Sequence, residues 1–410
     1  MNSKITSPRR ERLAELLSDS EGVIIFANSK PKLQRFLQDK NFLYFTGLNH
    51  PELIYFGMKF NGRFIETLFI ERSEPDRIVW EGEKLNAAQA TQISGIASIL
   101  HLDEFYSQLS MSGAYLKTIH TNLGFAELNK PPTLAMHMLE PLRTRFPQIG
   151  IRQLNELIAP LRKVKDEWEI QQLQKAIDVT GEGIADIMNS AQAGMMEYEL
   201  EATLFYRMQV SGLPHWGFAP IIASGLNAAT LHYEDNNCRT KKGELVLMDV
   251  GADCNGYSAD ITRCFPIGKK FSTRQKQIYQ LVLDVQKKII AMIKPGVKLS
   301  QLNEATRKGL AAALIKIGLI EKEEEIIRYY MHSVSHFLGL DTHDVGGRES
   351  VLEPGNVITV EPGIYIPEEK LGVRIEDDIL VTKTGHKVLS AAIPKEIADI
   401  EKIRAKVQVK

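Results

Sequence analysis

Residues 243–266 read GELVLMDVGADCNGYSADITRCFP, and this segment carries a carboxylate at the end of each of two apolar runs. Asp249 closes the first run and Asp260 opens the second, with Gly251 and Gly256 in the region between them. The pattern predicts a β-hairpin with both acids on its inner ends. Because a carboxylate at the end of a buried strand is costly unless it is paired or binds a metal, the hairpin indicates a cation site.

A second segment, residues 355–380, repeats this layout. A glycine lies six residues before Glu361, as one does before Asp249, and another glycine follows each acid by two residues. Glu376 then takes the place of Asp260, with four extra residues in the intervening turn. The two segments indicate an internal duplication. We therefore expect four carboxylates to converge where the two hairpins meet.

The composition limits the classes of protein to consider. The chain has 410 residues, of which 44% are hydrophobic and 25% charged, as in ordinary globular proteins of two or three domains. Its net charge of -1 gives no general attraction for nucleic acid or an anionic membrane. The three cysteines lack Cys-x-x-Cys spacing, which favours a reducing compartment. The first residues form no secretory signal and no apolar run is long enough to span a bilayer, so we expect a cytoplasmic protein.

The order of apolar patterns predicts two domains. Residues 1–155 read as an α/β domain with strands at 22–26, 42–46, 53–58 and 64–71, and without a ligand-like cluster of His, Asp and Glu. Such a domain is expected to serve in oligomerisation or to shape the mouth of a neighbouring site. Residues 156–410 read as two helices, a hairpin, two helices, a histidine segment and a second hairpin. This order predicts an α+β domain with helices over a curved antiparallel sheet.

The acids suggest a particular kind of metal site. Four carboxylates are too many ligands for a single buried ion. Two ions bridged by carboxylates can be coordinated by all four, and such a pair activates a water molecule between the ions. A histidine would complete the ligand set, and the candidates are His332, His336 and His343. A ligand set of oxygen atoms with one imidazole favours a manganese or cobalt site over a zinc site of the cysteine-rich kind.

In combination, these motifs resemble the pita-bread metallopeptidases, and within them the aminopeptidase P (Xaa-Pro aminopeptidase) family. The resemblance implies a C-terminal pita-bread domain, residues 156–410, behind a smaller N-terminal α/β domain, residues 1–155. The segments that carry it are Asp249-Val-Gly, Tyr257-Ser-Ala-Asp260-Ile-Thr-Arg, His332-x-x-Ser-His336, Asp341-x-His343-Asp, Glu361-Pro-Gly-x-Tyr365 and Arg374-Ile-Glu376, with Asn41 to Leu48 and Trp80-Glu81-Gly82 in the N-terminal part.

The resemblance also implies roles for single residues. The five metal ligands that it implies are Asp249, Asp260, His336, Glu361 and Glu376. Asp260 and Glu376 would bridge both ions, and Glu361 would also take the proton of the bridging water. The residues expected to contact the substrate or to orient a ligand are His232, His332, His343 and Arg374. Ser333 departs from the family, which often has glycine after the first histidine, and this departure affects the pose of His332.

The implied activity is that of an exopeptidase. The enzyme would use two divalent ions, manganese first with cobalt or zinc as alternatives, to cleave an N-terminal residue from a following proline. It would act on peptides as a homodimer or homotetramer. Three alternatives share the fold: a prolidase that cleaves only Xaa-Pro dipeptides, a non-catalytic binding protein, and a creatinase-like hydrolase without metal. The retained ligand positions argue against the last two.

Overall fold

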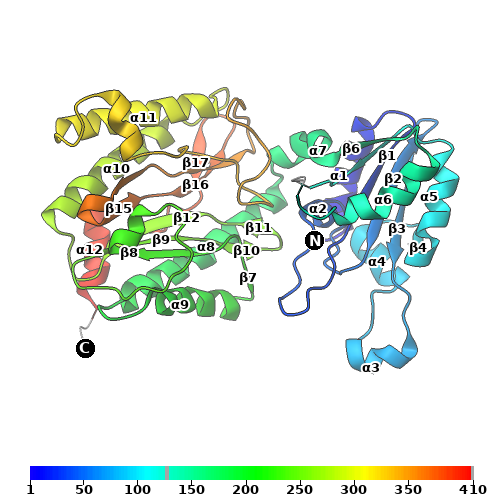
Figure 1. The fold of residues 1–410 in the computed structure, drawn as a ribbon, viewed down its shortest axis with the longest axis horizontal. Helices are drawn as coiled ribbons and strands as arrows, with labels where there is room; N and C mark the ends of the chain where they lie inside the picture. Colours follow the sequence, from blue (N-terminus) through cyan, green and yellow to red (C-terminus); the bar gives the residue numbers. More distant parts are fainter. Residues whose placement is uncertain (125–128, 408–410) are drawn as a thin grey trace. The chain divides into compact units, whose positions relative to one another are not determined.

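The computed structural model describes residues 1–124 and 129–407. The chain divides into two compact units, Met1–Leu161 and Arg162–Lys410, and the division falls within helix α7 (Leu154–Lys163) (Figure 1). None of the helices in the described ranges combines the length and apolar character that a bilayer crossing requires.

The first unit is built on a six-stranded mixed sheet with the strand order β4-β3-β2-β1-β5-β6. Asn61 and Gly62 join β2 to β3 with φ values of 48° and 74°, the left-handed conformation that an Asn-Gly pair favours in a two-residue hairpin turn. The strands are β1 (Glu21–Phe26), β2 (Ile54–Phe60), β3 (Arg63–Ile70), β4 (Ile99–His101), β5 (Thr118–Thr121) and β6 (Gly150–Gln153). The helices before α7 are α1 (Ser3–Leu16), α2 (Lys40–Thr46), α3 (Ile78–Glu81), α4 (Ala87–Ser94), α5 (Phe105–Gly113) and α6 (Leu134–Arg145).

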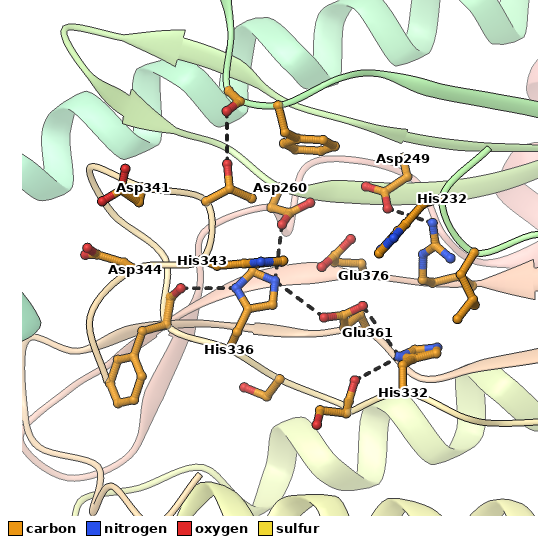
Figure 2. Close-up of a pocket in the computed structure, with 18 of the residues that line it drawn as sticks. His232, Asp249, Asp260, His332, His336, Asp341, His343, Asp344, Glu361 and Glu376 are labelled. Atoms are coloured by element: carbon orange, nitrogen blue, oxygen red, sulfur yellow. Dashed lines mark hydrogen bonds and ion pairs between the residues drawn. The ribbon is translucent and has the colours of Figure 1, made fainter. Parts of the chain in front are cut away.

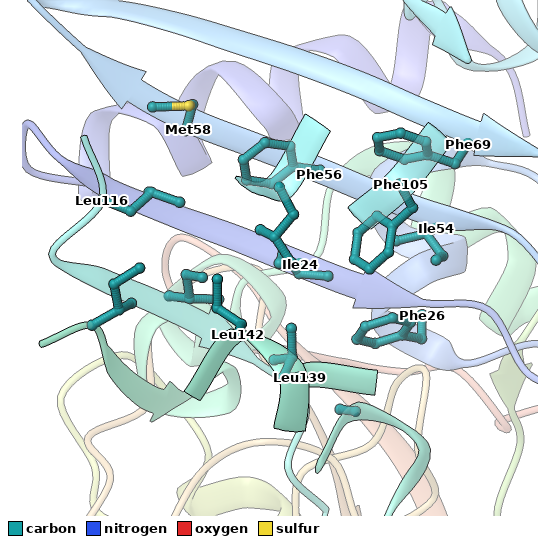
Figure 3. Packing of buried hydrophobic residues seen from close by; sticks show 14 residues of the cluster. Ile24, Phe26, Ile54, Phe56, Met58, Phe69, Phe105, Leu116, Leu139 and Leu142 are labelled. Carbon is teal, nitrogen blue, oxygen red and sulfur yellow. The ribbon is translucent and has the colours of Figure 1, made fainter. Parts of the chain in front are cut away.

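Three phenylalanine rings pack together in the hydrophobic core of this unit (Figure 3). The ring of Phe105 on α5 meets Phe26 and Phe69 edge-on, with centroid distances of 6.1 and 5.3 Å. Helices α5 and α6 thereby close one face of the sheet.

One predicted strand of the first unit is wrong. Residues 42–46 lie in helix α2, not in a strand. The carboxylate of Asp39 accepts a hydrogen bond from the backbone N–H of Phe42, and Gly47 ends the helix in the left-handed conformation, φ 71°. A short apolar run has no decisive periodicity, so its two caps determine the structure.

Both predicted hairpins are present in the second unit. Strand β9 pairs antiparallel with β12, and β13 pairs antiparallel with β16. Along the chain, each hairpin also contains a second, shorter pair of strands between its two outer strands. This pair is β10 with β11 in the first hairpin and β14 with β15 in the second. The strands are β7 (His215–Trp216), β8 (Ile221–Ser224), β9 (Leu245–Val250), β10 (Ala252–Cys254), β11 (Tyr257–Ser258), β12 (Ile261–Pro266), β13 (Val357–Val360), β14 (Gly363–Ile366), β15 (Leu371–Arg374), β16 (Asp377–Val381) and β17 (His386–Val388).

Helices flank these strands, which gives the second unit the expected α+β architecture (Figure 1). Asp166 caps α8 through a capping box with Glu169. Helix α8 packs on β10, β11 and β12, whereas α10 packs on β13, β14 and β15. The helices are α8 (Glu167–Ser190), α9 (Glu197–Val210), α10 (Thr273–Met292), α11 (Leu299–Lys316) and α12 (Ile397–Ala405).

Candidate metal centre

A cavity of about 960 Å³ opens in the second unit between the two hairpins and the segment that carries His332, His336 and His343 (Figure 2). Its wall includes all nine residues that the sequence analysis singled out: Asp249, Asp260, His336, Glu361, Glu376, His232, His332, His343 and Arg374. The structure thus brings together residues that are more than 100 positions apart in the chain.

His336 points one ring nitrogen at the carboxylates. Its Nε2 lies 3.3 Å from an oxygen of Asp260 and 3.4 Å from an oxygen of Glu361. Its Nδ1 lies 3.1 Å from the carbonyl oxygen of Phe337, which can only accept a hydrogen bond, so Nδ1 carries a proton. In the neutral ring this fixes the tautomer and leaves the Nε2 lone pair directed into the site, as a metal ligand requires.

Asp260 and Glu376 stand at the centre of the acidic group. Ligand atoms of Asp260, His336 and Glu376 all lie within 4.8 Å of one another. Both carboxylates are buried, and Glu376 accepts a hydrogen bond of 2.7 Å from the hydroxyl of Thr262. The same hydroxyl accepts a hydrogen bond of 3.1 Å from Arg374. Thr262 therefore fixes the orientation of an acid and an arginine at once.

Arg374 connects the acids to His332. Its guanidinium donates to Asp249 at 2.6 Å and to the hydroxyl of Tyr365 at 2.9 Å. Nδ1 of His332 lies 2.8 Å from the carbonyl of Ser333, so this nitrogen donates and Nε2 accepts from the Tyr365 hydroxyl at 2.9 Å. Arg374 thus orients Asp249 directly and His332 through Tyr365.

The remaining histidines lie at the edge of the same cavity. The ring of His343 meets that of His336 edge-on, with centroids 4.4 Å apart, whereas His232 lies beside Asp249 (Figure 2). Both His232 and His343 are exposed to solvent, so a molecule that enters the cavity can reach them.

The crowding of acids changes their pKa values. Burial, together with the charge of Asp249, raises the pKa of Asp260 to about 6. Burial also raises the pKa of Glu361, which settles at about 7 although the charge of His336 lowers it. Burial lowers the pKa of His336, but its hydrogen bond to Asp260 and the charge of Glu361 outweigh this effect and give about 9. Burial and the charge of Arg374 lower the pKa of His332 to about 4, so that ring is neutral at pH 7.

These residues fit a divalent cation. Oδ1 of Asp249 is buried and has no hydrogen-bond partner among the described residues, an arrangement that is costly unless another group meets this oxygen. The four candidate acid ligands share the cavity wall with Arg374, and a bound cation would offset the repulsion among their charges. The oxygen-rich donor set with one imidazole suits manganese, cobalt or zinc.

Sequence reasoning missed several supporting residues. Thr262 was accessible to it, because Thr262 follows Asp260 by two residues and such residues share one face of a strand. Asp344, next to His343, had no such signal. It is buried and accepts hydrogen bonds from Arg162 at 2.6 Å and Lys165 at 2.9 Å, across more than 170 residues of sequence.

The comparisons with known proteins agree with this geometry. Residues 171–383 match the description Metallopeptidase family M24, and the chain belongs to this family. Residues 7–120 match Aminopeptidase P, N-terminal domain. The resemblance inferred from the sequence is therefore confirmed.

Individual relatives cover both parts of the chain. The chain is similar to the Xaa-Pro aminopeptidase of Haemophilus influenzae, with 31% identity over 419 residues and coverage of 96% of each chain. It is similar in structure to a putative aminopeptidase P from Bacillus anthracis, with a TM-score of 0.95, 42% identity and full coverage of both chains. It also resembles Zn-substituted E. coli aminopeptidase P in complex with product, with a TM-score of 0.90, 28% identity and full coverage of both chains.

Proposed function

We propose that the protein is a metal-dependent aminopeptidase that removes the N-terminal residue of peptides with proline in second position. One observation carries this proposal: side chains of Asp249, Asp260, His336, Glu361 and Glu376, drawn from two hairpins and the segment before the second, line one cavity. Relatives that match the chain over nearly its whole length are named Xaa-Pro aminopeptidases, which supports the specificity for proline.

The same five residues would hold two divalent cations, with Asp260 and Glu376 between them. Bound ions of this kind lower the pKa of water and polarise a carbonyl group. Two ions are compatible with the charge of the site: one divalent ion would leave the four ionised carboxylates and Arg374 with excess negative charge, and two ions would leave an excess positive charge that a bound hydroxide would balance. We propose manganese as the native metal, with cobalt and zinc as alternatives. A zinc-substituted relative supports only the last of these.

The protein's own side chains would handle protons and position the substrate. Glu361 would take the proton from the attacking water and deliver it to the proline nitrogen as that nitrogen leaves. His232, His332 and His343 would contact the substrate, and exposed donors such as His232 and His343 suit the developing negative charge on the carbonyl oxygen. Arg374 would hold Asp249 in place. The tertiary amide before proline has no N–H, so the site must recognise the ring by its shape.

Peptide cleavage tests the proposal. Protein stripped of metal is reconstituted separately with Mn²⁺, Co²⁺ or Zn²⁺ and offered matched Xaa-Pro-Xaa and Xaa-Ala-Xaa tripeptides and an Xaa-Pro dipeptide, with products identified by mass spectrometry. We expect release of the first residue from the Xaa-Pro-Xaa peptide only in the presence of metal. Cleavage of the dipeptide alone identifies a prolidase. Stoichiometric metal without cleavage of any peptide identifies a binding protein.

The wider setting of the enzyme is also a proposal. We assign residues 1–155 to an N-terminal domain and residues 156–410 to the catalytic domain, and the two family matches support this division. A homodimer or homotetramer is supported by side chains of the first unit that are apolar and strongly exposed: Leu33, Val79 and Trp80. Three free cysteines support the cytoplasm, and the net charge of -1 gives no support for a nucleic acid or membrane partner. Light scattering after size-exclusion chromatography measures the oligomeric state.

A further inference from the structure

A buried carboxylate outside the candidate metal centre has an unusual set of partners. Glu197, in the first turn of α9, is fully buried. Within the described residues, its two oxygens accept hydrogen bonds from the backbone N–H groups of Ser224 at 2.7 Å and Cys238 at 2.9 Å. They also accept from the hydroxyls of Ser224 at 2.7 Å and Tyr233 at 2.8 Å, and from the amide of Asn227 at 3.2 Å. Hydrogen bonds to a charged acceptor are the strong ones.

These donors share one origin, because they all belong to residues 224–238. Residues 225–237, here called the His232 loop, run from the end of β8 to the segment that precedes β9. Ser224 stands at the entrance of this loop and Cys238 at its exit, so Glu197 ties both ends to the same point. Tyr233, the neighbour of His232, is tied there as well.

Helix capping does not explain Glu197. The capping acid of α9 is Glu199, whose exposed carboxylate accepts a hydrogen bond of 2.6 Å from the backbone N–H of Met196. Glu197 therefore has a separate role on the same helical turn, directed at the loop.

The first part of the loop lies against the strand that carries Arg374. The 3-10 helix η3 (Gly225–Ala229) contacts β15, and a Cβ atom placed on Gly372 would come within 1.7 Å of the Ala228 carbonyl oxygen. The loop is thus attached both to Glu197 and to β15, and His232 reaches the cavity from this segment (Figure 2). An exposed histidine on a loop without such attachments would sample many positions.

We propose that Glu197 is a positioning residue for substrate turnover: it fixes both ends of the His232 loop and thereby holds His232 at the candidate metal centre. This inference rests on the proposed function, in which His232 contacts the substrate. Neutralising Glu197 would leave the metal ligands in place and move the histidine.

The variant Glu197→Gln tests the inference, with Glu199→Gln as the matched control on the same turn. The amide of glutamine keeps the size of the side chain but replaces one acceptor oxygen by a donor that faces other donors. We expect kcat/KM for an Xaa-Pro-Xaa peptide to fall roughly 10- to 100-fold, mainly through kcat, because small displacements of a catalytic group have effects of this size. The control should stay within about twofold of wild type, and both variants should bind the same amount of metal.

Two further measurements separate positioning from general damage. In His232→Ala protein, adding Glu197→Gln should cause no further loss of kcat, because the histidine through which Glu197 acts is already absent. Hydrogen exchange should be faster across residues 225–237 in Glu197→Gln than in Glu199→Gln, independently of turnover. If Glu197→Gln fails to fold, Tyr233→Phe removes one donor of the same cluster and should show a smaller effect of the same kind.

The outcomes distinguish this inference from the proposed function. Wild-type protein that binds metal but cleaves no peptide refutes the proposed function, and hydrogen exchange then decides whether Glu197 holds the loop. Active wild type with unchanged exchange and kcat in Glu197→Gln overturns the inference alone. Losses that multiply in the double variant also overturn it, because Glu197 would then act through something other than His232.

Discussion

The replacement Asp377→Asn tests how the second hairpin tolerates its buried charges. Asp377 follows the candidate ligand Glu376 and is fully buried. Its carboxylate accepts hydrogen bonds from Arg263 at 2.8 Å and Ser390 at 2.6 Å, and it also pairs with Lys395. Arg263 is itself fully buried, so the replacement leaves its charge without its carboxylate partner.

The lowered pKa of Asp377 and the buried charge of Arg263 each set a magnitude for the stability lost in Asp377→Asn. Burial by itself raises the pKa of Asp377, but the charges of Arg263 and Lys395 outweigh it and set the pKa at about 2, against an ordinary value of 3.8. That difference corresponds to roughly 2 kcal/mol of stability. Removing one partner of a buried pair costs roughly 3–5 kcal/mol, because the other charge stays buried. Lys395 is 19% exposed and can turn to water, so we expect about 3 kcal/mol.

Tryptophan fluorescence during urea unfolding of the metal-free protein measures this loss. Trp168 and Trp216 are partly buried in the second unit, whereas Trp80 in the first unit is 87% exposed and should change little. The signal therefore reports the unit that contains Asp377. Urea leaves the charges unscreened, and Asp284→Asn on the exposed side of α10 serves as the control, with an expected change below about 0.5 kcal/mol.

The pH dependence supplies a second check on Asp377→Asn. Because folding lowers the pKa of Asp377, the folded state binds fewer protons, and the charge contributes fully above pH 3.8 and is lost as the pH falls towards 2. The difference between wild type and variant should therefore be equal at pH 7 and pH 5. A difference below about 1 kcal/mol at pH 7, or one that already shrinks between pH 7 and pH 5, would refute the reasoning.

Three other predictions concern the site and its support. In the metal-free protein the pKa values of Asp260, Glu361 and His336 are about 6, 7 and 9, so protons compete with metal, and calorimetric metal affinity should rise more than about tenfold from pH 6 to pH 8. Glu361→Ala should lower kcat by roughly 10³-fold or more, with an unchanged circular dichroism spectrum, since it removes both a ligand and the proposed base. Gly372→Ala should destabilise the protein by roughly 1–3 kcal/mol in urea unfolding, because its methyl group meets the Ala228 carbonyl; wild-type stability would contradict this.

The hairpins were predictable because their signals are local. Apolar runs, turn glycines and terminal acids lie within about 25 residues of sequence in each hairpin, and Asn61-Gly62 specifies its turn directly. The run from Phe42 to Thr46 shows the limit of this approach. Its apolar side chains suit a strand or a buried helix equally, and the deciding interactions come from Asp39 and Gly47 at its ends.

The supporting residues of the site were less accessible for a different reason. Asp344, Glu197 and Asp377 are acids whose significance depends on partners far away in the chain, and nothing in their neighbouring sequence identifies those partners. The spacing of residues in a short stretch of sequence therefore identifies candidate metal ligands and catalytic groups. It does not find the charges that hold those groups in place, because burial and pairing are properties of the folded chain.

The geometry of the acids also implies a dependence of folding on metal. Asp249, Asp260, Glu361 and Glu376 meet at the centre of a folded unit, and burial raises the pKa of both Asp260 and Glu376, so the folded chain without cations holds its carboxylates at an electrostatic cost. Groups such as Arg374 and Thr262 orient these acids but supply only one positive charge among them. Cations that bind the folded state and not the unfolded chain would offset this cost, with a gain that grows with the logarithm of their concentration. Metal binding is therefore expected to stabilise the folded state through the two hairpins that supply the carboxylates.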